Sequence, residues 1–123
     1  MAHFPQPQRN VRAPRVRIPD QAQVVFVAEN RQIPAVLNKL SSTGGTACLA
    51  RKCPVGLLAE LRLNTTSGSV QALVEILGRP DPIVKEQPFR FVAMSDEDQQ
   101  LLNSTLARLR RQGFGEAVQR RSF

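Results

Sequence analysis

The chain has 123 residues, a formal net charge of +7 and a pI near 11.0. This length suits one domain with one modest core, and the excess of Lys and Arg favours an anionic partner such as nucleic acid, a nucleotide, a membrane surface or an acidic protein. No apolar run approaches the roughly 20 residues needed to span a bilayer, and the N-terminus lacks the apolar segment of a secretory signal. We therefore expect a cytoplasmic protein without membrane insertion.

The composition offers little to metal or nucleophile chemistry. The chain has two cysteines, Cys48 and Cys53, and one histidine, His3, which cannot assemble a zinc site. Neither cysteine has a base near it in the sequence. We predict no metal, no cofactor and no enzymatic activity. The cysteines are expected as reduced, half-buried thiols, with a disulfide across the short loop between them as the alternative.

Residues 1–19 combine helix-breaking and cationic residues and contain no acid. The prolines and arginines are Pro5, Pro7, Pro14, Pro19, Arg9, Arg12, Arg15 and Arg17. Such a segment cannot bury enough apolar surface to order itself. It is predicted to be a flexible arm, either a solvated tail or an arm that folds over an anion through its guanidinium groups.

The middle of the chain has the period-two pattern of β-strands. The predicted strands are 23–28, 33–38, 46–50, 57–63, 70–77 and 89–93. The alternation is clearest in 57–63, where Leu57, Ala59, Leu61 and Leu63 share one face, and it recurs in 70–77. Polar or glycine-containing turns separate these strands. The pattern predicts a mainly β protein.

The period then changes to that of a helix. Ser95 is the expected N-cap, followed by three acids that complement the helix dipole, and Gly113 is the expected C-terminal cap. The apolar stripe of this helix is Leu101, Leu102, Leu106 and Leu109. Six short strands and one C-terminal helix predict a small antiparallel β-barrel or sandwich covered by the helix. Residues 112–123 form a basic tail.

The segment 37–46 lies between two of these strands and holds the candidate site. It contains Lys39, Ser41 and two adjacent glycines, Gly44 and Gly45. Glycines permit a positive φ and the close approach of another group, and hydroxyl and N–H groups suit phosphate or carbonyl oxygens. The alternative is a hairpin turn whose geometry demands the glycine pair.

The order of these parts resembles a PilZ domain over residues 9–111. That family has an arginine-rich arm, a six-stranded antiparallel barrel with a C-terminal helix, and an Asp/Asn-x-Ser-x-x-Gly motif between early strands. The matching segments are 12–16, 39–45 and 89–98. The resemblance implies a flexible arm at 1–19, a barrel with its helix at 20–111, and a receptor for cyclic di-GMP that relays this signal to an unidentified partner protein.

The resemblance places the ligand contacts on Arg12 and Arg15 of the arm and on Lys39, Ser41 and Gly44 of the turn. Arginine forks match the O6 and N7 atoms of guanine and the phosphates. Two positions depart from the family pattern. Val11 stands four residues before Arg15, where the family has an arginine, and Lys39 replaces Asp or Asn.

These departures bear on how guanine could be bound. A lysine cannot accept a hydrogen bond from guanine, although it can pair with a phosphate. Strict alternation places Asn38 on the opposite strand face, so Asn38 is not expected to replace the missing acceptor. Two alternatives therefore stay open: a PilZ-like adaptor that acts only by protein contact, and a small RNA- or DNA-binding barrel. The lack of Tyr and Trp for base stacking disfavours the nucleic-acid alternative.

Overall fold

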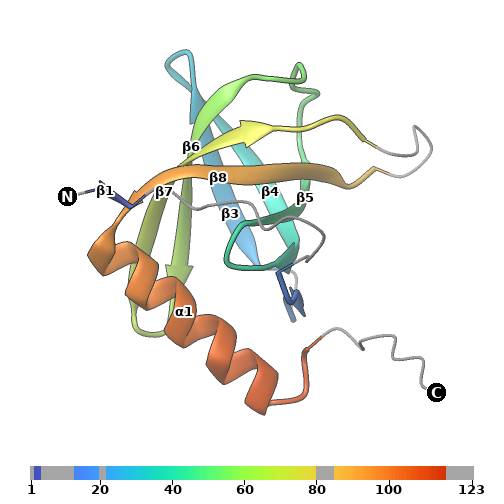
Figure 1. Ribbon diagram of the computed structural model, residues 1–123. Coiled ribbons are helices and arrows are strands. Elements are labelled where there is room, and N and C mark those ends of the chain that lie inside the picture. Colours follow the sequence, from blue (N-terminus) through green and yellow to red (C-terminus); the bar gives the residue numbers. More distant parts are fainter. Residues whose placement is uncertain (1, 4–12, 20–21, 80–84, 116–123) are drawn as a thin grey trace.

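The computed structural model describes residues 2–3, 13–19, 22–79 and 85–115. Six antiparallel strands close into a barrel, and one C-terminal helix lies beneath it (Figure 1). This confirms the predicted barrel with a C-terminal helix. The barrel strands are β3 (Gln23–Ala28), β4 (Arg31–Leu40), β5 (Gly44–Leu49), β6 (Leu58–Thr65), β7 (Gly68–Ile76) and β8 (Gln87–Ser95).

The barrel closes in the order β8-β5-β4-β3-β6-β7, with β7 pairing back to β8. Closure leaves no long strand edge open to pairing with other chains. Two short strands lie outside this ring: β1 (Ala2–His3) pairs with β8, and β2 (Val16–Arg17) pairs with β4. The N-terminal segment therefore touches the barrel at two places.

The alternation in β6 and β7 fills the barrel as the sequence predicts. Ala59, Leu61 and Leu63 are buried on β6, and so are the alternate residues of β7 from Val70 to Ile76. Leu57 precedes β6 and is half-buried against the core. Outward-facing polar residues carry exposed ion pairs such as Arg62–Glu60, whose Nη2 and Oε1 atoms are 2.9 Å apart. Such pairs add little stability, so burial holds the strands in place.

Aromatic residues fill the centre of the barrel. Phe26 of β3 packs edge-on against Phe89 of β8 with 5.5 Å between ring centroids, and Phe89 packs in the same way against Phe91. All three are buried. Such geometry adds a directional term to the area that these rings bury. The contacts join β3 to β8 across the barrel, and β8 in turn pairs with β5, where the candidate turn ends.

Helix α1 (Asp96–Arg111) begins and ends as predicted. Ser95 is the N-cap, and its Oγ accepts a hydrogen bond from the backbone N–H of Asp98 at 3.1 Å. Gly113 has a φ of +93°, and the N–H of Phe114 donates to the carbonyl of Leu109 at 2.9 Å. These bonds form a Schellman ending that returns the chain toward the barrel. The predicted stripe is buried at Leu102, Leu106 and Leu109, and Leu101 packs at its border.

The cap at Ser95 leads to a stability prediction. Replacing Ser95 by alanine removes the acceptor of the Asp98 N–H and should lower the free energy of unfolding by about 1 kcal/mol. Urea unfolding followed by circular dichroism measures this change. The control is Ser104→Ala, an exposed position inside the same helix, where alanine should be neutral or slightly stabilising. Equal losses for the two variants would contradict the assigned cap.

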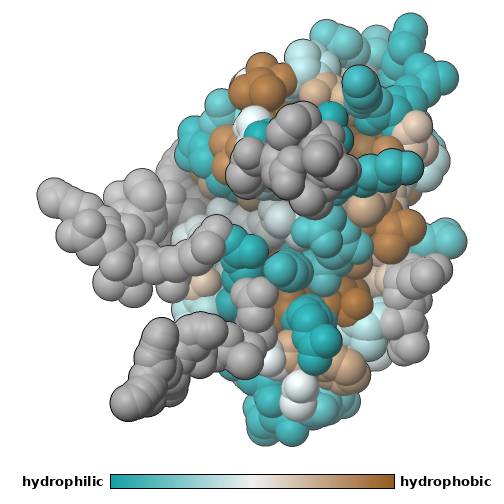
Figure 2. All heavy atoms as spheres, turned by 90° about the vertical axis from the view of Figure 1, so that its right-hand side faces the viewer, coloured by the Kyte–Doolittle hydropathy of each residue, from teal (hydrophilic) through white to brown (hydrophobic). Residues whose placement is uncertain are grey.

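Hydrophilic residues predominate on the face shown in Figure 2, and hydrophobic ones form small separate patches. Among the described residues, the large hydrophobic side chains with high exposure are Val55, Leu58 and Leu73. No described helix has the length and apolar character needed to cross a membrane. The two cysteines are free and half-buried, and burial raises the pKa of the Cys53 thiol. The thiol form of Cys53 is therefore favoured.

Candidate functional site

Strand β2 pairs with the end of β4 and brings the basic arm onto the barrel. Val16 lies opposite Leu40 and Arg17 opposite Lys39 in an antiparallel register. Val16 is fully buried, and the N–H of Ile18 donates to the carbonyl of Asn38 at 2.8 Å. Burial of Val16 in the core anchors this end of the arm. Residues 4–12 lie outside the described residues, so the flexible arm at 1–19 stays a prediction.

This register places Arg15 next to the candidate turn. Arg15 precedes Val16 and Ser41 follows Leu40, so the two residues continue the paired positions of β2 and β4. The Ser41 N–H donates to the Gly44 carbonyl at 2.7 Å, which ties both ends of the turn together. Arg15 and Lys39, both half-buried, thus lie near the buried residues Ser41 and Gly44 of the turn. Arg12, the fifth predicted residue, lies outside the described residues.

Ser41 is built into the turn. Its side chain is buried, its Oγ accepts from the Thr43 N–H at 3.2 Å, and it lies 3.2 Å from the Gly44 carbonyl, to which it can donate. The Thr43 carbonyl accepts from the Phe91 N–H at 2.8 Å. A hydroxyl with these internal partners stabilises the turn and orients the residues beside it. Direct contact of Ser41 or Gly44 with a ligand stays a prediction.

The two glycines of the turn, Gly44 and Gly45, are not needed for a positive φ. Gly44 and Gly45 do not have a positive φ, unlike Gly56, Gly68 and Gly113. A Cβ on Gly44 would overlap the backbone oxygen of Phe89 and lie 2.8 Å from the Cα of Arg90, and one on Gly45 would overlap the Lys39 carbonyl. The glycines therefore allow close approach, as predicted, but the groups that approach are strands β8 and β4 of the protein itself.

A β-bulge changes which residues of β4 face outward. Leu37 pairs with Ala47, but the next pair is Lys39 with Thr46, so Asn38 is the extra residue. Leu37 and Leu40 both point into the core, while Asn38 and Lys39 between them are both half-buried on the outside. The expectation that Asn38 lies on the opposite face from Lys39 is therefore wrong. The bulge breaks the alternation on which that expectation depended.

The bulge also gives the Asn38 amide a defined orientation. Its Nδ2 donates to the Sγ of Cys48 on the neighbouring strand β5 at 3.4 Å. With Nδ2 directed to Cys48, the Oδ1 atom is the part of the amide that can accept a hydrogen bond from a ligand. The sequence places an acceptor one residue before the family position, and the structure turns it to the same side as Lys39.

A groove of about 320 Å³ opens where the arm, the bulge and the end of the helix meet. Its wall contains apolar, cationic, amide and carboxylate side chains. The lining residues are Arg17, Ile18, Pro19, Asn38, Lys39, Glu86 and Phe114. The N–H of Arg17 donates to the Phe114 carbonyl at 2.8 Å, so the segment after α1 closes one side. Sequence reasoning counted Arg17 among the arginines of the arm without assigning it to the site, and it missed Glu86 and Phe114 because no motif marks them.

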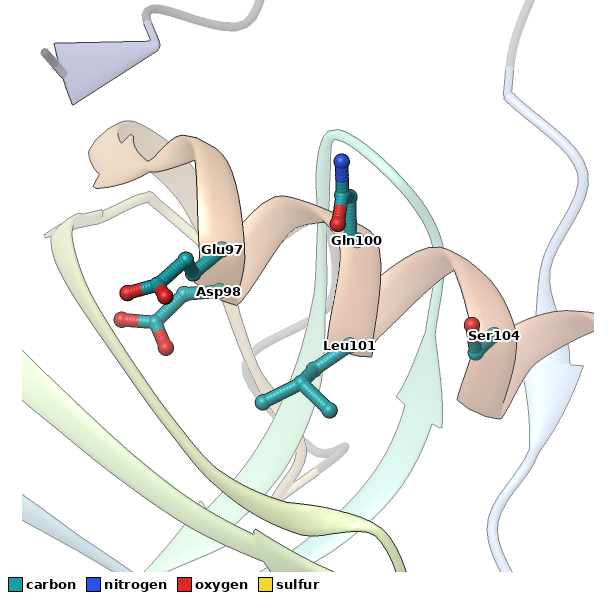
Figure 3. Close-up of a pocket in the computed structure, with 5 residues that line it drawn as sticks. All are labelled: Glu97, Asp98, Gln100, Leu101 and Ser104. Carbon is teal, nitrogen blue, oxygen red and sulfur yellow. The ribbon is translucent and has the colours of Figure 1, made fainter.

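Two other hollows suit an anion less well. Figure 3 shows the one on α1, where the carboxylates of Glu97 and Asp98 point to the same side and Leu101 points toward the sheet. Gln100 and Ser104 complete its described lining. A hollow whose charged groups are two carboxylates repels phosphate. The third lies over β3, β4, β6 and β7 and is lined mainly by uncharged polar side chains, and its one charged described residue, Arg62, is paired with Glu60.

Comparison with known proteins supports the fold. No protein-family model and no curated protein matches the sequence. Among solved structures, the PilZ domain with c-di-GMP of YcgR from Escherichia coli matches with a TM-score of 0.65 and 18% identity, covering 85% of this chain and 94% of that one. The chain therefore has the PilZ fold, which confirms at the level of the fold the resemblance seen in the sequence.

Proposed function

We propose that this chain is a receptor domain for cyclic di-GMP that relays the signal to a partner protein and catalyses no reaction. The observation that carries the proposal is the register of β2 on β4, which sets Arg15 beside the 41–44 turn. The similar PilZ domain of YcgR is described with c-di-GMP. Where β2 pairs with β4, the chain offers cations and a hydrogen-bond acceptor to a ligand with two phosphates and two guanines.

Each polar group near the paired ends of β2 and β4 has a chemical counterpart on this ligand. The Arg15 guanidinium can donate two parallel hydrogen bonds to O6 and N7 of guanine or to a phosphate. Lys39 is suited to a phosphate because an ammonium only donates. Asn38, turned outward by the bulge, can accept from a guanine donor through Oδ1. Ser41 and Gly44 hold the turn that positions these groups.

The test is titration calorimetry of the full chain with cyclic di-GMP. We expect saturable heat with one class of site, because the arm and the turn meet at one place on the barrel. The association should weaken as salt rises, since the contacts to the phosphates are ionic. A flat heat signal at high ligand concentration would contradict the proposal and leave the adaptor alternative, in which the PilZ fold acts only through protein contacts.

The observation that favours the adaptor is Lys39 at the position where the family motif has Asp or Asn. The nucleic-acid alternative depends on the net charge of +7. Filter binding to single-stranded and double-stranded DNA and to RNA in a salt series tests that alternative, because binding through phosphates weakens steeply as salt rises. Tight, salt-dependent binding to a polynucleotide, with no heat from cyclic di-GMP, would favour it.

A further inference from the structure

Glu86 is the one acid among the described residues that line the groove between the arm, the β4 bulge and the end of α1. It is half-buried just before β8 and shares the groove wall with Arg17 and Lys39. Within the described part of the chain, the carboxylates joined to a cation belong to Glu60 and Glu75, and Glu86 forms no hydrogen bond or ion pair there. A carboxylate in this place repels phosphates, so it weakens anion binding unless the ligand supplies it with hydrogen-bond donors.

Guanine supplies such donors. Its Watson–Crick edge presents the N1–H and an N2 amino hydrogen side by side, and an ionised carboxylate can accept from both because it carries only acceptors. Adenine presents a bare N1, whose lone pair faces the carboxylate unfavourably, beside its N6 amino group. A groove that aims a carboxylate at the base edge therefore selects guanine over adenine.

The rest of the groove suits the body of a purine nucleotide. Phe114, Ile18 and Pro19 contribute apolar surface on which a base can lie flat. Arg17 and Lys39 contribute the positive charge that the phosphates need. The groove volume of about 320 Å³ is within the range of small-molecule sites. These side chains come from four separate parts of the chain: β2 and the residues after it, β4, the segment before β8, and the segment after α1.

We propose that Glu86 reads the donor edge of one guanine and supplies the carboxylate acceptor that Lys39 cannot provide at the motif position. This inference rests on the proposed function and names the residue that sets the choice of base. Asn38 lines the same groove, and its Oδ1 can also accept a hydrogen bond from the base, but a neutral amide accepts less strongly than a carboxylate. Glu86 is therefore the residue on which discrimination depends.

The test compares Glu86→Gln with the unmodified chain by titration calorimetry, using cyclic di-GMP and cyclic di-AMP as ligands. Glutamine keeps the size of the side chain but removes the negative charge and one acceptor. Its amide hydrogens would also face the guanine donors. We expect affinity for cyclic di-GMP to fall about ten-fold or more, and affinity for cyclic di-AMP to stay the same or rise. The control is Glu60→Gln, a half-buried glutamate on β6 that pairs with Arg62 and does not line the groove.

The direction of the change separates this role from simple electrostatics. If Glu86 only repelled phosphates, Glu86→Gln would strengthen binding of both ligands. That outcome, or unchanged affinity for cyclic di-GMP, would overturn the assignment of Glu86 and leave the proposed receptor function standing. Failure of the unmodified chain to bind cyclic di-GMP would overturn both. An unchanged melting temperature of the variant shows that a loss of affinity does not come from unfolding.

Discussion

Replacing Gly44 by alanine should destabilise the barrel by about 3 kcal/mol or more, which corresponds to a fall in melting temperature of roughly 10 °C or more. The new Cβ would overlap the Phe89 carbonyl oxygen and lie 2.8 Å from the Cα of Arg90. Both atoms belong to the backbone of β8, which cannot move aside without losing its pairing with β5. Thermal unfolding followed by circular dichroism measures the loss.

The matched control is Gly78→Ala. Gly78 is exposed, does not have a positive φ, and an added Cβ there would make only an ordinary contact with Val55 at 3.9 Å. The control should therefore leave the melting temperature nearly unchanged. If Gly44→Ala were as stable as this control, the close packing of β5 on β8 would be wrong. If the melting temperature falls strongly, a loss of ligand binding by Gly44→Ala reflects damage to the fold and not the loss of a ligand contact.

The sequence predicts the fold well where burial alone decides the conformation. Strand β7 is bounded within two residues of its predicted limits, because Val70, Ala72, Val74 and Ile76 alternate without interruption. The cap at Ser95 is equally clear, since a hydroxyl followed by three acids is favoured at a helix start. These signals are local, so a single stretch of sequence contains them.

The hairpin turn between β3 and β4 is shorter than the sequence predicts. The predicted strands 23–28 and 33–38 leave the polar run 29–32 as a turn, but only Glu29 and Asn30 leave the strands, with φ values of +51° and +63°. Two residues with positive φ match the twist of the flanking strands. Arg31 and Gln32 join β4 although they are polar, because both are exposed on the barrel surface and the pairing with β3 satisfies their backbone.

The site is less predictable because it depends on long-range pairing. The bulge at Asn38 follows from how β4 meets β5, and nothing in the residues 37–40 themselves announces it. Glu86 and Phe114 reach the groove from segments that are far from the turn in the sequence. A motif search finds the residues of one segment, here Lys39, Ser41 and Gly44, and cannot find partners that only the closed barrel brings to the same wall.

Replacing Arg15 by alanine should weaken binding of cyclic di-GMP about ten- to hundred-fold and leave folding intact. Arg15 lies beside the 41–44 turn, where its guanidinium can make two hydrogen bonds to a guanine or a phosphate. Loss of one bidentate contact costs about 1–3 kcal/mol, which is roughly a ten- to hundred-fold loss of affinity. Titration calorimetry measures the affinity. The melting temperature should change little, because Val16 holds β2 by its fully buried side chain.

The charge-matched control is Arg31→Ala, at the opposite end of β4 from Lys39. It removes the same charge from an exposed position, so a purely long-range electrostatic effect would weaken binding by both variants to a similar extent. Specific contact predicts that only Arg15→Ala loses binding, and that raising the salt concentration does not bring the two variants together. Unchanged affinity in Arg15→Ala would mean that Arg15, next to the paired strands β2 and β4, does not contact the ligand, although the fold would still be that of a PilZ domain.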